Sequence, residues 1–459
     1  MTENTRNKFF VEDFEKLFKL LNKDENKDKN IDKKNIRLKR TFEDLARLSL
    51  MDATYNSGMV FNTECCKPHP VANMAYLSFI DRNMCKEQYP SVTLMERDAI
   101  NWLASLFNNK NYSSVKDPLG YISSGGTVAN IVAFWAARNK ERLRGGKRFK
   151  IIVPESAHYS KVKIEDLLGL KCVSIPVDEE TQIVNVEDVE KAIDDETLGI
   201  YATAGTSRFG LIDPIKEFSD LAIKHNLHLH VDAAFGGYIL PFMKMLDNEV
   251  PDWDFSLPGV SSITVDPHKM GLCPLGAGAI IFRDESFIKA YRYKADFPKI
   301  TNNSLEGSKC GGAVAATWAM QQYWGIEGYK NNVKNILSII DYIKNSILSL
   351  EGVSLVLNPI PTNILGFDFG SNENNRIILE KLKQLGFQIS GLRNNSGVRI
   401  IIHSHVKLEH ARRIINCITE LHNIIVKNKE ELSFSSFDSV LNELKVIQGA
   451  EPLVFEEEE

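Results

Sequence analysis

The chain contains 459 residues, of which 43% are hydrophobic and 25% are charged. This length and composition are typical of a globular protein with roughly two to three domains, and they exclude collagen-like, wholly disordered and disulfide-scaffold proteins. Lys and Arg number 55 against 60 Asp and Glu, which gives a formal net charge of -5. Because there is no basic excess to attract a phosphate backbone, we expect no nucleic-acid partner.

The seven cysteines are scattered, apart from the adjacent Cys65 and Cys66. They form neither a disulfide framework nor a paired zinc-binding pattern, so we expect reduced thiols and no metal site. Glu12, Asp13 and Glu15 interrupt the apolar residues of the N-terminal segment, and no run of about 18 apolar residues occurs. These features predict a soluble, cytoplasmic protein without a signal peptide or a membrane span.

The first segment predicts an amphipathic helix with an apolar face that a second subunit can cover. Its apolar residues at helical spacing are Phe9, Phe10, Phe14, Leu17, Phe18 and Leu21. Residues 22–40 are mostly Lys, Asn and Asp, which predicts a solvated linker and a domain boundary near residue 40. The acidic run at residues 456–459 is typical of a frayed tail.

Between about residues 90 and 290, short β-rich runs alternate with helical stretches. The runs are Lys150–Val153, Lys171–Val177, Gly199–Ala204, His228–Ala233, Ser261–Val265 and Ala277–Phe282. This alternation predicts an α/β domain whose largely parallel sheet is covered on both faces. Ligands of such sheets bind at the carboxyl ends of the strands.

A smaller α+β domain is predicted after Gly311 and Gly312. Helical patterns cover Ala313–Tyr323, Tyr329–Leu350, Asn375–Leu385 and Leu408–Val426, and strand-like runs cover Val353–Leu357, Ile364–Phe369 and Val398–Ile402. No internal repeat is present.

Two strand-end residues carry groups that can do covalent chemistry. Lys269 follows the run Ser261–Val265 in a Pro-His-Lys turn, and Asp232 ends the run His228–Ala233 among small apolar residues. Alone, such a lysine is usually a solvated surface charge, and such an aspartate is a helix cap or turn residue. Together they are what pyridoxal 5′-phosphate requires, because a lysine holds this cofactor as a Schiff base and a carboxylate pairs with its ring nitrogen.

The segment Ser123–Asn130 predicts a phosphate-binding turn. Gly125, Gly126 and Thr127 stand directly before an amphipathic helical pattern, and backbone amides at a helix start bind phosphate. A Ser-Gly-Gly turn also commonly serves only to begin a helix. The position of the turn upstream of the other two motifs adds weight to the phosphate interpretation.

Two further side chains follow predicted strands. His158, just after a strand, can stack on the cofactor ring, although an isolated histidine is more often structural. Thr206, in the segment Ala204–Gly210, can donate a hydrogen bond toward the ring or its phenolic oxygen, and the alternative for this segment is a tight turn.

Five segments occur in one order within residues 50–425. They are Pro68–Ala72, Ser124–Thr127, Ser156–Tyr159, His230–Gly237 and Leu257–Leu272. In these segments the chain resembles the fold-type I, pyridoxal-phosphate-dependent group II amino acid decarboxylases. It is most similar to the archaeal L-tyrosine/L-aspartate decarboxylases, with sphingosine-phosphate lyase as a more distant relative.

The resemblance implies the fold-type I architecture, in which a large domain has a mainly parallel seven-stranded sheet and a smaller C-terminal domain is α+β. We expect an N-terminal helical segment and linker over residues 1–75 and the large cofactor-binding domain over residues 76–305. The small domain is then expected over residues 306–430 and a C-terminal extension over residues 431–459.

The resemblance also implies roles for the residues already singled out. Lys269 binds the cofactor covalently, Asp232 pairs with the pyridinium, His158 stacks above the ring and Ala234 supports its other face. The remaining expected cofactor contacts are Gly125, Gly126, Thr127 and His268 at the phosphate and Thr206 near the ring oxygen.

A substrate site is expected beside the cofactor. Arg399 matches a small-domain arginine position and is our candidate for binding the substrate α-carboxylate, although a strand-end surface charge is the alternative. We expect the segment Tyr55–His69 to line the side-chain pocket, with His69 as a contact, together with the partner chain.

The chain departs from its relatives in two places. Lys309 stands where relatives carry an arginine that reaches the phosphate of the partner subunit, and a lysine lacks the bidentate fork. Phe297 stands where relatives carry a tyrosine that helps to protonate the α-carbon. Tyr291 or Tyr293 can replace that tyrosine only if the fold brings one of them to the site.

The predicted function is decarboxylation of an L-amino acid of the tyrosine, aspartate or glutamate type to a primary amine and CO2, in a homodimer with shared active sites. One alternative keeps the cofactor but breaks another bond, as in a carbon–carbon lyase, an aminotransferase or an oxidative deaminase. Another is a cofactor-binding interaction protein that has lost its catalysis.

Overall fold

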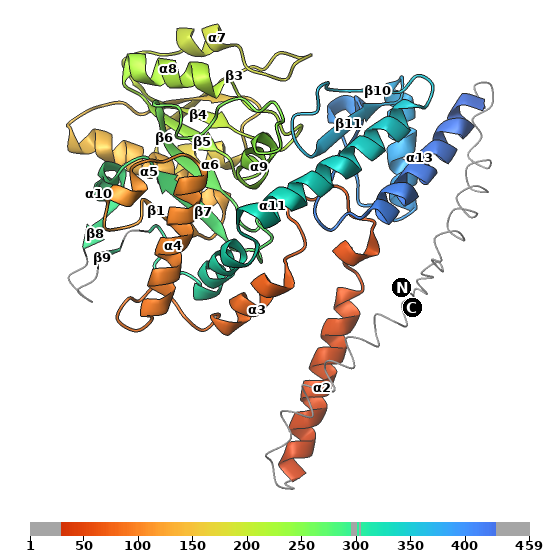
Figure 1. Ribbon diagram of the computed structural model, residues 1–459, viewed down its shortest axis with the longest axis horizontal. Coiled ribbons are helices and arrows are strands. Elements are labelled where there is room, and N and C mark those ends of the chain that lie inside the picture. The colour runs from red at the N-terminus through yellow and green to blue at the C-terminus, as the bar shows by residue number, and fades with distance from the viewer. Residues whose placement is uncertain (1–28, 295–300, 303, 428–459) are drawn as a thin grey trace.

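A seven-stranded sheet forms the centre of the larger part of the molecule in this computed structural model, which describes residues 29–294, 301–302 and 304–427 (Figure 1). The strand order is β1-β7-β6-β5-β4-β2-β3. The strands are β1 (Gly120–Ser123), β2 (Lys150–Pro154), β3 (Lys171–Ile175), β4 (Thr197–Thr203), β5 (His228–Asp232), β6 (Val260–Val265) and β7 (Gly278–Phe282).

The sheet is mainly parallel, as predicted. The pairs from β3 through β2, β4 and β5 to β6 are parallel, whereas β7 runs antiparallel to both β6 and β1. Every run predicted between residues 150 and 282 is a strand, and β1 is an additional strand that the alternation did not reveal. The strands β2, β4, β5 and β7 are buried along their whole length, which explains their continuous apolar runs.

Helices cover both faces of this sheet. One face packs against α5 (Gly126–Leu143), α6 (Ser160–Leu168) and α10 (Glu285–Tyr291). The other face packs against α4 (Pro90–Leu106), α8 (Ile215–His225) and α9 (Leu240–Lys244). The short helix α7 (Val186–Lys191) lies against α8. This arrangement leaves the strand ends as the place where loop residues meet.

The smaller part has its own antiparallel sheet, in the order β10-β11-β13-β12. The strands are β10 (Ser354–Leu355), β11 (Ile364–Asp368), β12 (Ser390–Gly391) and β13 (Val398–Ile401). The helices α12 (Asn372–Gln384) and α13 (Leu408–Lys427) pack with this sheet and with each other. The predicted small α+β unit is therefore present.

The two helices predicted after Gly312 are one element, α11 (Gly311–Leu348), which runs between the two parts (Figure 1). It is interrupted at Gly325, whose φ of +53° and ψ of −161° are not helical. A positive φ is easily adopted by glycine, so the break falls between the two predicted helices. The first half of α11 packs on α4 and on α3 (Pro70–Ser78), and α11 also packs on α13.

The short elements connect these units. They are a two-residue hairpin of β8 (Tyr293–Lys294) and β9 (Thr301–Asn302), and the 3-10 turns η1 (Tyr55–Ser57), η2 (Tyr112–Ser114), η3 (Gly236–Tyr238) and η4 (Arg393–Asn395).

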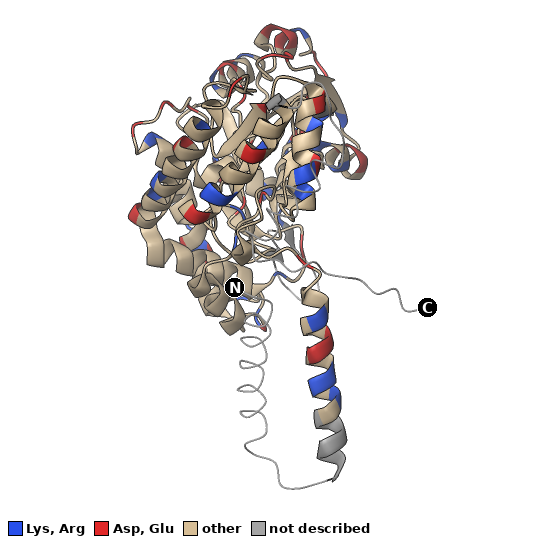
Figure 2. Cartoon of the chain, turned by 90° about the vertical axis from the view of Figure 1, so that its right-hand side faces the viewer, with Lys and Arg blue, Asp and Glu red and all other residues tan. Residues whose placement is uncertain are grey.

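The predicted linker over residues 22–40 is wrong in its second half, because α2 (Lys29–Ser49) is a helix. Figure 2 shows α2 with charges of both signs, projecting from the rest of the molecule. The Nζ of Lys39 lies 3.7 Å from a carboxylate oxygen of Glu43, one helical turn away. The low apolar content of this segment indicates that the helix has no buried face, but it does not exclude a helix. Charge pairs one turn apart stabilise a helix without burial.

Three sequence predictions fall on residues that lie outside the described part. They concern the N-terminal amphipathic helix over residues 9–21, Phe297, and the tail at residues 456–459. Within the described residues we find no helix whose length and hydropathy would allow it to span a bilayer.

Candidate active site

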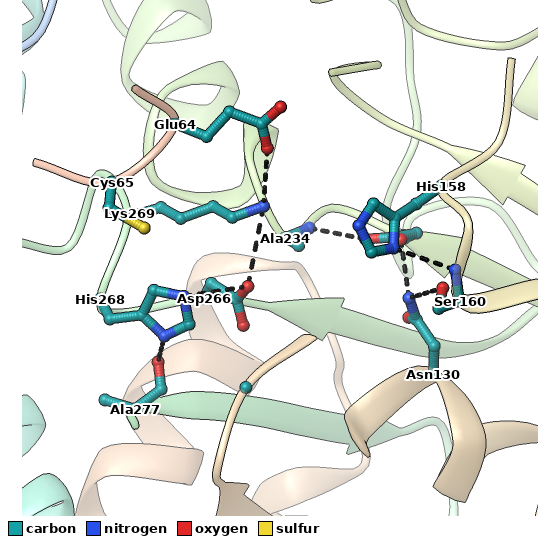
Figure 3. Close-up of polar contacts among 12 residues, drawn as sticks. Glu64, Cys65, Asn130, His158, Ser160, Ala234, Asp266, His268, Lys269 and Ala277 are labelled. Carbon is teal, nitrogen blue, oxygen red and sulfur yellow. Dashed lines mark hydrogen bonds and ion pairs between the residues drawn. The ribbon is translucent and has the colours of Figure 1, made fainter. Parts of the chain in front are cut away.

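Lys269 lies in the turn after β6 with its ammonium between two carboxylates (Figure 3). Its Nζ is 3.3 Å from Oε2 of Glu64 and 3.8 Å from Oδ2 of Asp266. Burial would lower the pKa of Lys269, but the charges of Asp266, Glu64 and Asp232 outweigh burial and raise it to about 12. The side chain is therefore a buried cation with acids in reach to take its proton.

Asp232 is the last residue of β5, which pairs with β6, so its carboxylate and Lys269 follow neighbouring parallel strands. Oδ2 of Asp232 accepts hydrogen bonds from Tyr201 Oη at 2.6 Å and Asn130 Nδ2 at 2.7 Å, and Oδ1 accepts from the Ala234 amide at 3.0 Å. Burial alone would raise the pKa of Asp232. The hydrogen bond from Tyr201, the charge of Lys269 and the Ala234 amide more than offset this effect and lower it, so Asp232 is a buried anion.

A line of buried polar side chains continues behind Asp232. Oδ1 of Asn130 lies 2.9 Å from His230 Nε2, His230 Nδ1 lies 2.9 Å from Ser262 Oγ, and Ser262 Oγ lies 3.0 Å from His228 Nε2. Because an amide oxygen only accepts, His230 carries its proton on Nε2 and its Nδ1 accepts from Ser262. Burial lowers the pKa of His230 to about 4, so this line is neutral and holds Asn130 in one orientation toward Asp232.

The predicted phosphate-binding turn lies beside these residues, where α5 begins. Gly125 precedes the helix with φ of +150° and supplies no side-chain cap. A Cβ atom on Gly126 would lie 2.8 Å from Oδ2 of Asp266 and 3.1 Å from the Cβ of Ala234. The turn is therefore close to the residues that follow β5 and β6, and its first amides, which have no partner within the helix, can bind an acceptor from outside it. Thr127 occupies the second helical position.

Two histidines flank the turn and the carboxylate. His268 donates from Nδ1 to the Ala277 carbonyl at 2.8 Å, and its Cε1 would lie 3.4 Å from a Cβ on Gly125. His158 accepts from the Ser160 amide through Nδ1 at 3.2 Å. Burial lowers the pKa of His158, while the nearby Asp232 opposes that shift. A neutral imidazole thus lies next to the buried carboxylate.

Thr206 lies in a turn whose next two residues accept hydrogen bonds from Arg399 of the smaller part. Thr206 is buried, and its Oγ1 accepts from the Leu211 amide at 3.0 Å, which is the tight-turn arrangement. Arg399, on β13, donates from Nε to the carbonyl of Arg208 at 2.9 Å and from Nη2 to the carbonyl of Ser207. Arg399 is therefore a buried charge that faces the larger part rather than a strand-end surface charge.

His69 has contacts that belong to helix α3. Its Nδ1 accepts from the Val71 amide at 3.2 Å as the N-cap, and its ring centroid lies 5.4 Å from those of Tyr323 and Trp324. Its amide donates to the carbonyl of Leu272, three residues beyond Lys269, at 2.9 Å. Substrate contact by His69 stays a prediction.

The structure describes one of the two departures from the expected pattern. Nζ of Lys309 is 2.8 Å from Oε1 of Glu96, and both side chains are about nine-tenths buried. Lys309 is thus held by its own chain instead of reaching outward as a surface cation. Tyr291 is buried against Trp135 and Phe282, so it is a core residue. Phe297 lies outside the described residues.

Sequence reasoning missed three polar residues of this site. Asp266 stands directly after a predicted strand, where its position at the strand end was the available signal, whereas Tyr201 lies inside a predicted strand and gave no such signal. Glu64 lies 205 residues from Lys269 in the chain and reaches it through a loop before α3. No spacing in the sequence connects these two residues.

The arrangement fits pyridoxal 5′-phosphate. A lysine and a buried carboxylate anion are present for the aldehyde and the ring nitrogen, and an uncapped helix start is present for the phosphate. Oδ1 of Asp266 is buried without a hydrogen-bond partner among the described atoms. A ligand that carries donors and fills the space at Gly126 would complete the site.

Comparisons with known proteins agree with this chemistry. The pyridoxal-dependent decarboxylase conserved domain matches residues 60–365. A probable L-aspartate decarboxylase of Thermococcus gammatolerans is 38% identical over 386 residues, which cover 83% of this chain and 96% of that protein. A probable L-tyrosine/L-aspartate decarboxylase of Methanothermobacter thermautotrophicus is 35% identical over 367 residues, covering 79% and 97%.

A solved structure has the same fold. The sphingosine-1-phosphate lyase of Burkholderia pseudomallei superposes with a TM-score of 0.77 at 27% identity, covering 88% of this chain and 94% of that one. The fold and cofactor expected from the sequence are confirmed. The chain belongs to the pyridoxal-dependent decarboxylase family, and it is an amino acid decarboxylase that uses pyridoxal 5′-phosphate.

Proposed function

We propose that this decarboxylase converts an L-amino acid of the tyrosine, aspartate or glutamate type into a primary amine and CO2. The observation that carries the proposal is the meeting of Lys269 and Asp232 at neighbouring strand ends around one buried site. The names of the relatives from T. gammatolerans and M. thermautotrophicus support an acidic or phenolic substrate.

The proposed catalytic residues are Lys269, Asp232 and His158. Bound pyridoxal 5′-phosphate supplies an electron sink for the bond that breaks at the α-carbon. Lys269 would hold the cofactor covalently through its ε-amine. Asp232 keeps a proton on the ring nitrogen, and because three donors already orient its carboxylate, its charge needs no rearrangement during the reaction. His158 covers one face of the ring.

We assign the remaining cofactor contacts to the turn before α5 and to its neighbours. Gly125, Gly126 and Thr127 would present backbone amides to the phosphate, and the imidazole of His268 lies next to Gly125 with its Cε1 toward that residue. The close approach at Gly126 supports this assignment, because a side chain there would collide with Asp266. The last two assigned contacts are Ala234 under the ring and Thr206 near its oxygen.

Arg399 is our candidate for binding the substrate α-carboxylate, with His69 nearer the side chain. The guanidinium of Arg399 is buried and within 4.0 Å of Glu64, which in turn contacts Lys269. A guanidinium that stays charged when buried suits a carboxylate ligand.

We also propose a homodimer with its active sites at the subunit interface. Large apolar side chains on α2 and α3 support it, since Leu45 and Leu48 are at least half exposed and Met74 and Leu77 are about two-thirds exposed. Light scattering should give about twice the chain mass of 51.8 kDa. A single-chain mass at micromolar concentration would contradict the dimer.

A cytoplasmic location and the four-part division at residues 75, 305 and 430 remain part of this proposal. Reduced thiols support the location, because Cys65, Cys66, Cys85, Cys172 and Cys273 carry no disulfide. Fractionation of cells that produce the full chain tests it, and recovery outside the cytoplasmic fraction would contradict it.

The function is tested by incubating the purified, cofactor-loaded protein with each common L-amino acid and measuring amine and CO2. We expect one amino acid or a small group to give equal amounts of both products. Lys269→Ala should lose the amine product and the labelling by borohydride that marks a lysine-bound cofactor. If other products accumulate without CO2, another reaction of the same cofactor replaces decarboxylation.

A further inference from the structure

Glu64 is held in place from both sides of its loop. The carbonyl of the preceding residue, Thr63, accepts a hydrogen bond from Nε2 of the buried His403 at 2.7 Å. Two residues later, the thiol of Cys66 donates to the carbonyl of Lys269. The backbone that carries Glu64 is thus tied to the small part and to the lysine turn, which makes its position a property of the fold.

The carboxylate of Glu64 lies between two cations. Its Oε2 is 3.3 Å from Nζ of Lys269 (Figure 3). Its Oε1 is 4.0 Å from Nη2 of Arg399, and the side chain is 28% exposed. On the proposed function, the substrate amine goes to the position of the Lys269 amine and its carboxylate goes to Arg399. Any substrate therefore lies alongside Glu64.

Among the groups that the structure describes beside Glu64, Arg399 is the cation that remains for a substrate carboxylate, because Lys269 is assigned to the cofactor. Arg399 already donates two hydrogen bonds to backbone carbonyls. Burial lowers the pKa of His403 to about 3 and that of His405 to about 4, and it also lowers that of His158. These imidazoles are neutral near pH 7 and add no cation.

The other groups around Lys269 carry negative charge or none. Asp266 and Asp232 are acids, and burial raises the pKa of the neighbouring Cys65 thiol, so it stays neutral. A second carboxylate on the substrate side chain would therefore meet Glu64 without a cation from these groups to balance it. The cost of such like-charge contacts is largest where water is excluded.

We propose that Glu64 is a specificity-determining residue that makes the site select amino acids with an uncharged side chain, of the tyrosine type, against L-aspartate and L-glutamate. The inference rests on the proposed function and narrows its substrate class. It predicts that L-tyrosine has the higher kcat/KM in the cofactor-loaded wild-type protein.

The test compares wild type with Glu64→Gln, which keeps the size of the side chain and removes its charge. The ratio of kcat/KM for L-aspartate to that for L-tyrosine should rise at least about tenfold in the variant. The repulsion energy between two carboxylates a few ångströms apart corresponds to more than a tenfold change in binding. Glu217→Gln, on the exposed start of α8, is the matched control and should leave the ratio unchanged. Glu64→Ala should move the ratio in the same direction.

A binding measurement gives a readout that does not depend on turnover. Calorimetry of the cofactor-loaded protein with succinate and with 3-(4-hydroxyphenyl)propionate compares ligands with two carboxylates and with one. Glu64→Gln should strengthen succinate binding by a larger factor than binding of the monocarboxylate. Equal factors, or an unchanged kcat/KM ratio in a variant that unfolds at the wild-type temperature, would overturn the role of Glu64.

The two proposals fail in different ways. If no amino acid gives an amine, the proposed function is wrong, and the calorimetry alone decides on Glu64. If amine forms but wild type prefers L-aspartate, the decarboxylase stands and the role of Glu64 is wrong.

Discussion

Replacing Asp232 by Asn removes the charge that we pair with the cofactor ring while changing little else in size. A carboxylate about 4 Å from a ring nitrogen at an effective dielectric near 20 contributes on the order of 4 kcal/mol. Halving this value for desolvation leaves about 2 kcal/mol, so the ring pKa should fall by roughly 1.5–3 units. If the charged ring is what lowers the barrier, turnover should fall by a factor of roughly 30 to 1,000.

The hydrogen bonds around Asp232 fix how the new amide would lie. Tyr201 and Asn130 both donate to Oδ2, so the carbonyl oxygen of an Asn would stay on that side. Its NH2 group would then take the place of Oδ1 and face the amide of Ala234, donor against donor. If the cofactor ring lies on this side of residue 232, an amide donor there would also favour the unprotonated ring.

The assay is steady-state amine formation normalised to bound cofactor, measured by absorbance. Asp232→Asn should keep bound cofactor, and a cofactor analogue methylated at the ring nitrogen should recover at least about tenfold in turnover, because its charge is permanent. Asp254→Asn is the matched control, since Asp254 is also buried and accepts from a backbone amide, that of Ser256. Turnover of Asp232→Asn within threefold of wild type would refute the assignment of Asp232.

Three further predictions concern neighbouring residues. Tyr201→Phe should lower the free energy of unfolding by about 1.5–3 kcal/mol at pH 7, because a hydrogen bond to a buried charge is lost. The pKa of Asp232 is lowered in the folded state, so its contribution to stability is present above the ordinary value near 4 and is lost as the pH falls through the folded pKa. The difference between the two proteins in urea titrations should therefore shrink below about pH 4, and a constant difference would contradict the reasoning. Gly126→Ala should weaken cofactor retention during dialysis about tenfold or more with the fold intact, since its Cβ would lie 2.8 Å from a carboxylate oxygen; unchanged retention would move the phosphate elsewhere. Lys309→Met should destabilise the protein by about 3–5 kcal/mol in denaturant titrations, because its buried partner Glu96 would be left without a counter-charge. The double variant with Glu96→Gln should recover much of this loss, and no recovery would contradict the ion-pair explanation.

The strand-end residues could be predicted from the sequence because their placement follows from one rule. The carboxyl ends of neighbouring parallel strands meet at one edge of a sheet, so Asp232 after β5 and Lys269 after β6 come together without any knowledge of loops. The phosphate-binding turn follows β1, which belongs to the same sheet because it pairs with β7. The position of the turn beside Asp232 and Lys269 could be predicted for this related reason.

The rest of the site depends on contacts that no periodic pattern in the sequence predicts. Asn130 lies within a recognised motif. Its hydrogen bond to Asp232 nevertheless depends on how α5 packs against β5, which the sequence does not show. Glu64 comes from a loop whose path is set by His403 in the small part. The wrong linker over residues 22–40 has a different origin, because the apolar residues of α2 that recur at helical spacing, Leu38, Phe42, Leu45 and Leu48, lie mostly beyond residue 40.

Helix α11 makes the two halves of the molecule mutually dependent. Ala313, Val314 and Met320 at its beginning are buried against the larger part, whereas Ile340 and Ile343 near its end are buried with the smaller one. Separating the chain near residue 305 would strip a core-forming surface from the upstream fragment and leave the downstream fragment with an uncovered apolar stretch. Heterologous production of either fragment should therefore give insoluble material, while co-production should restore soluble protein by reassembly.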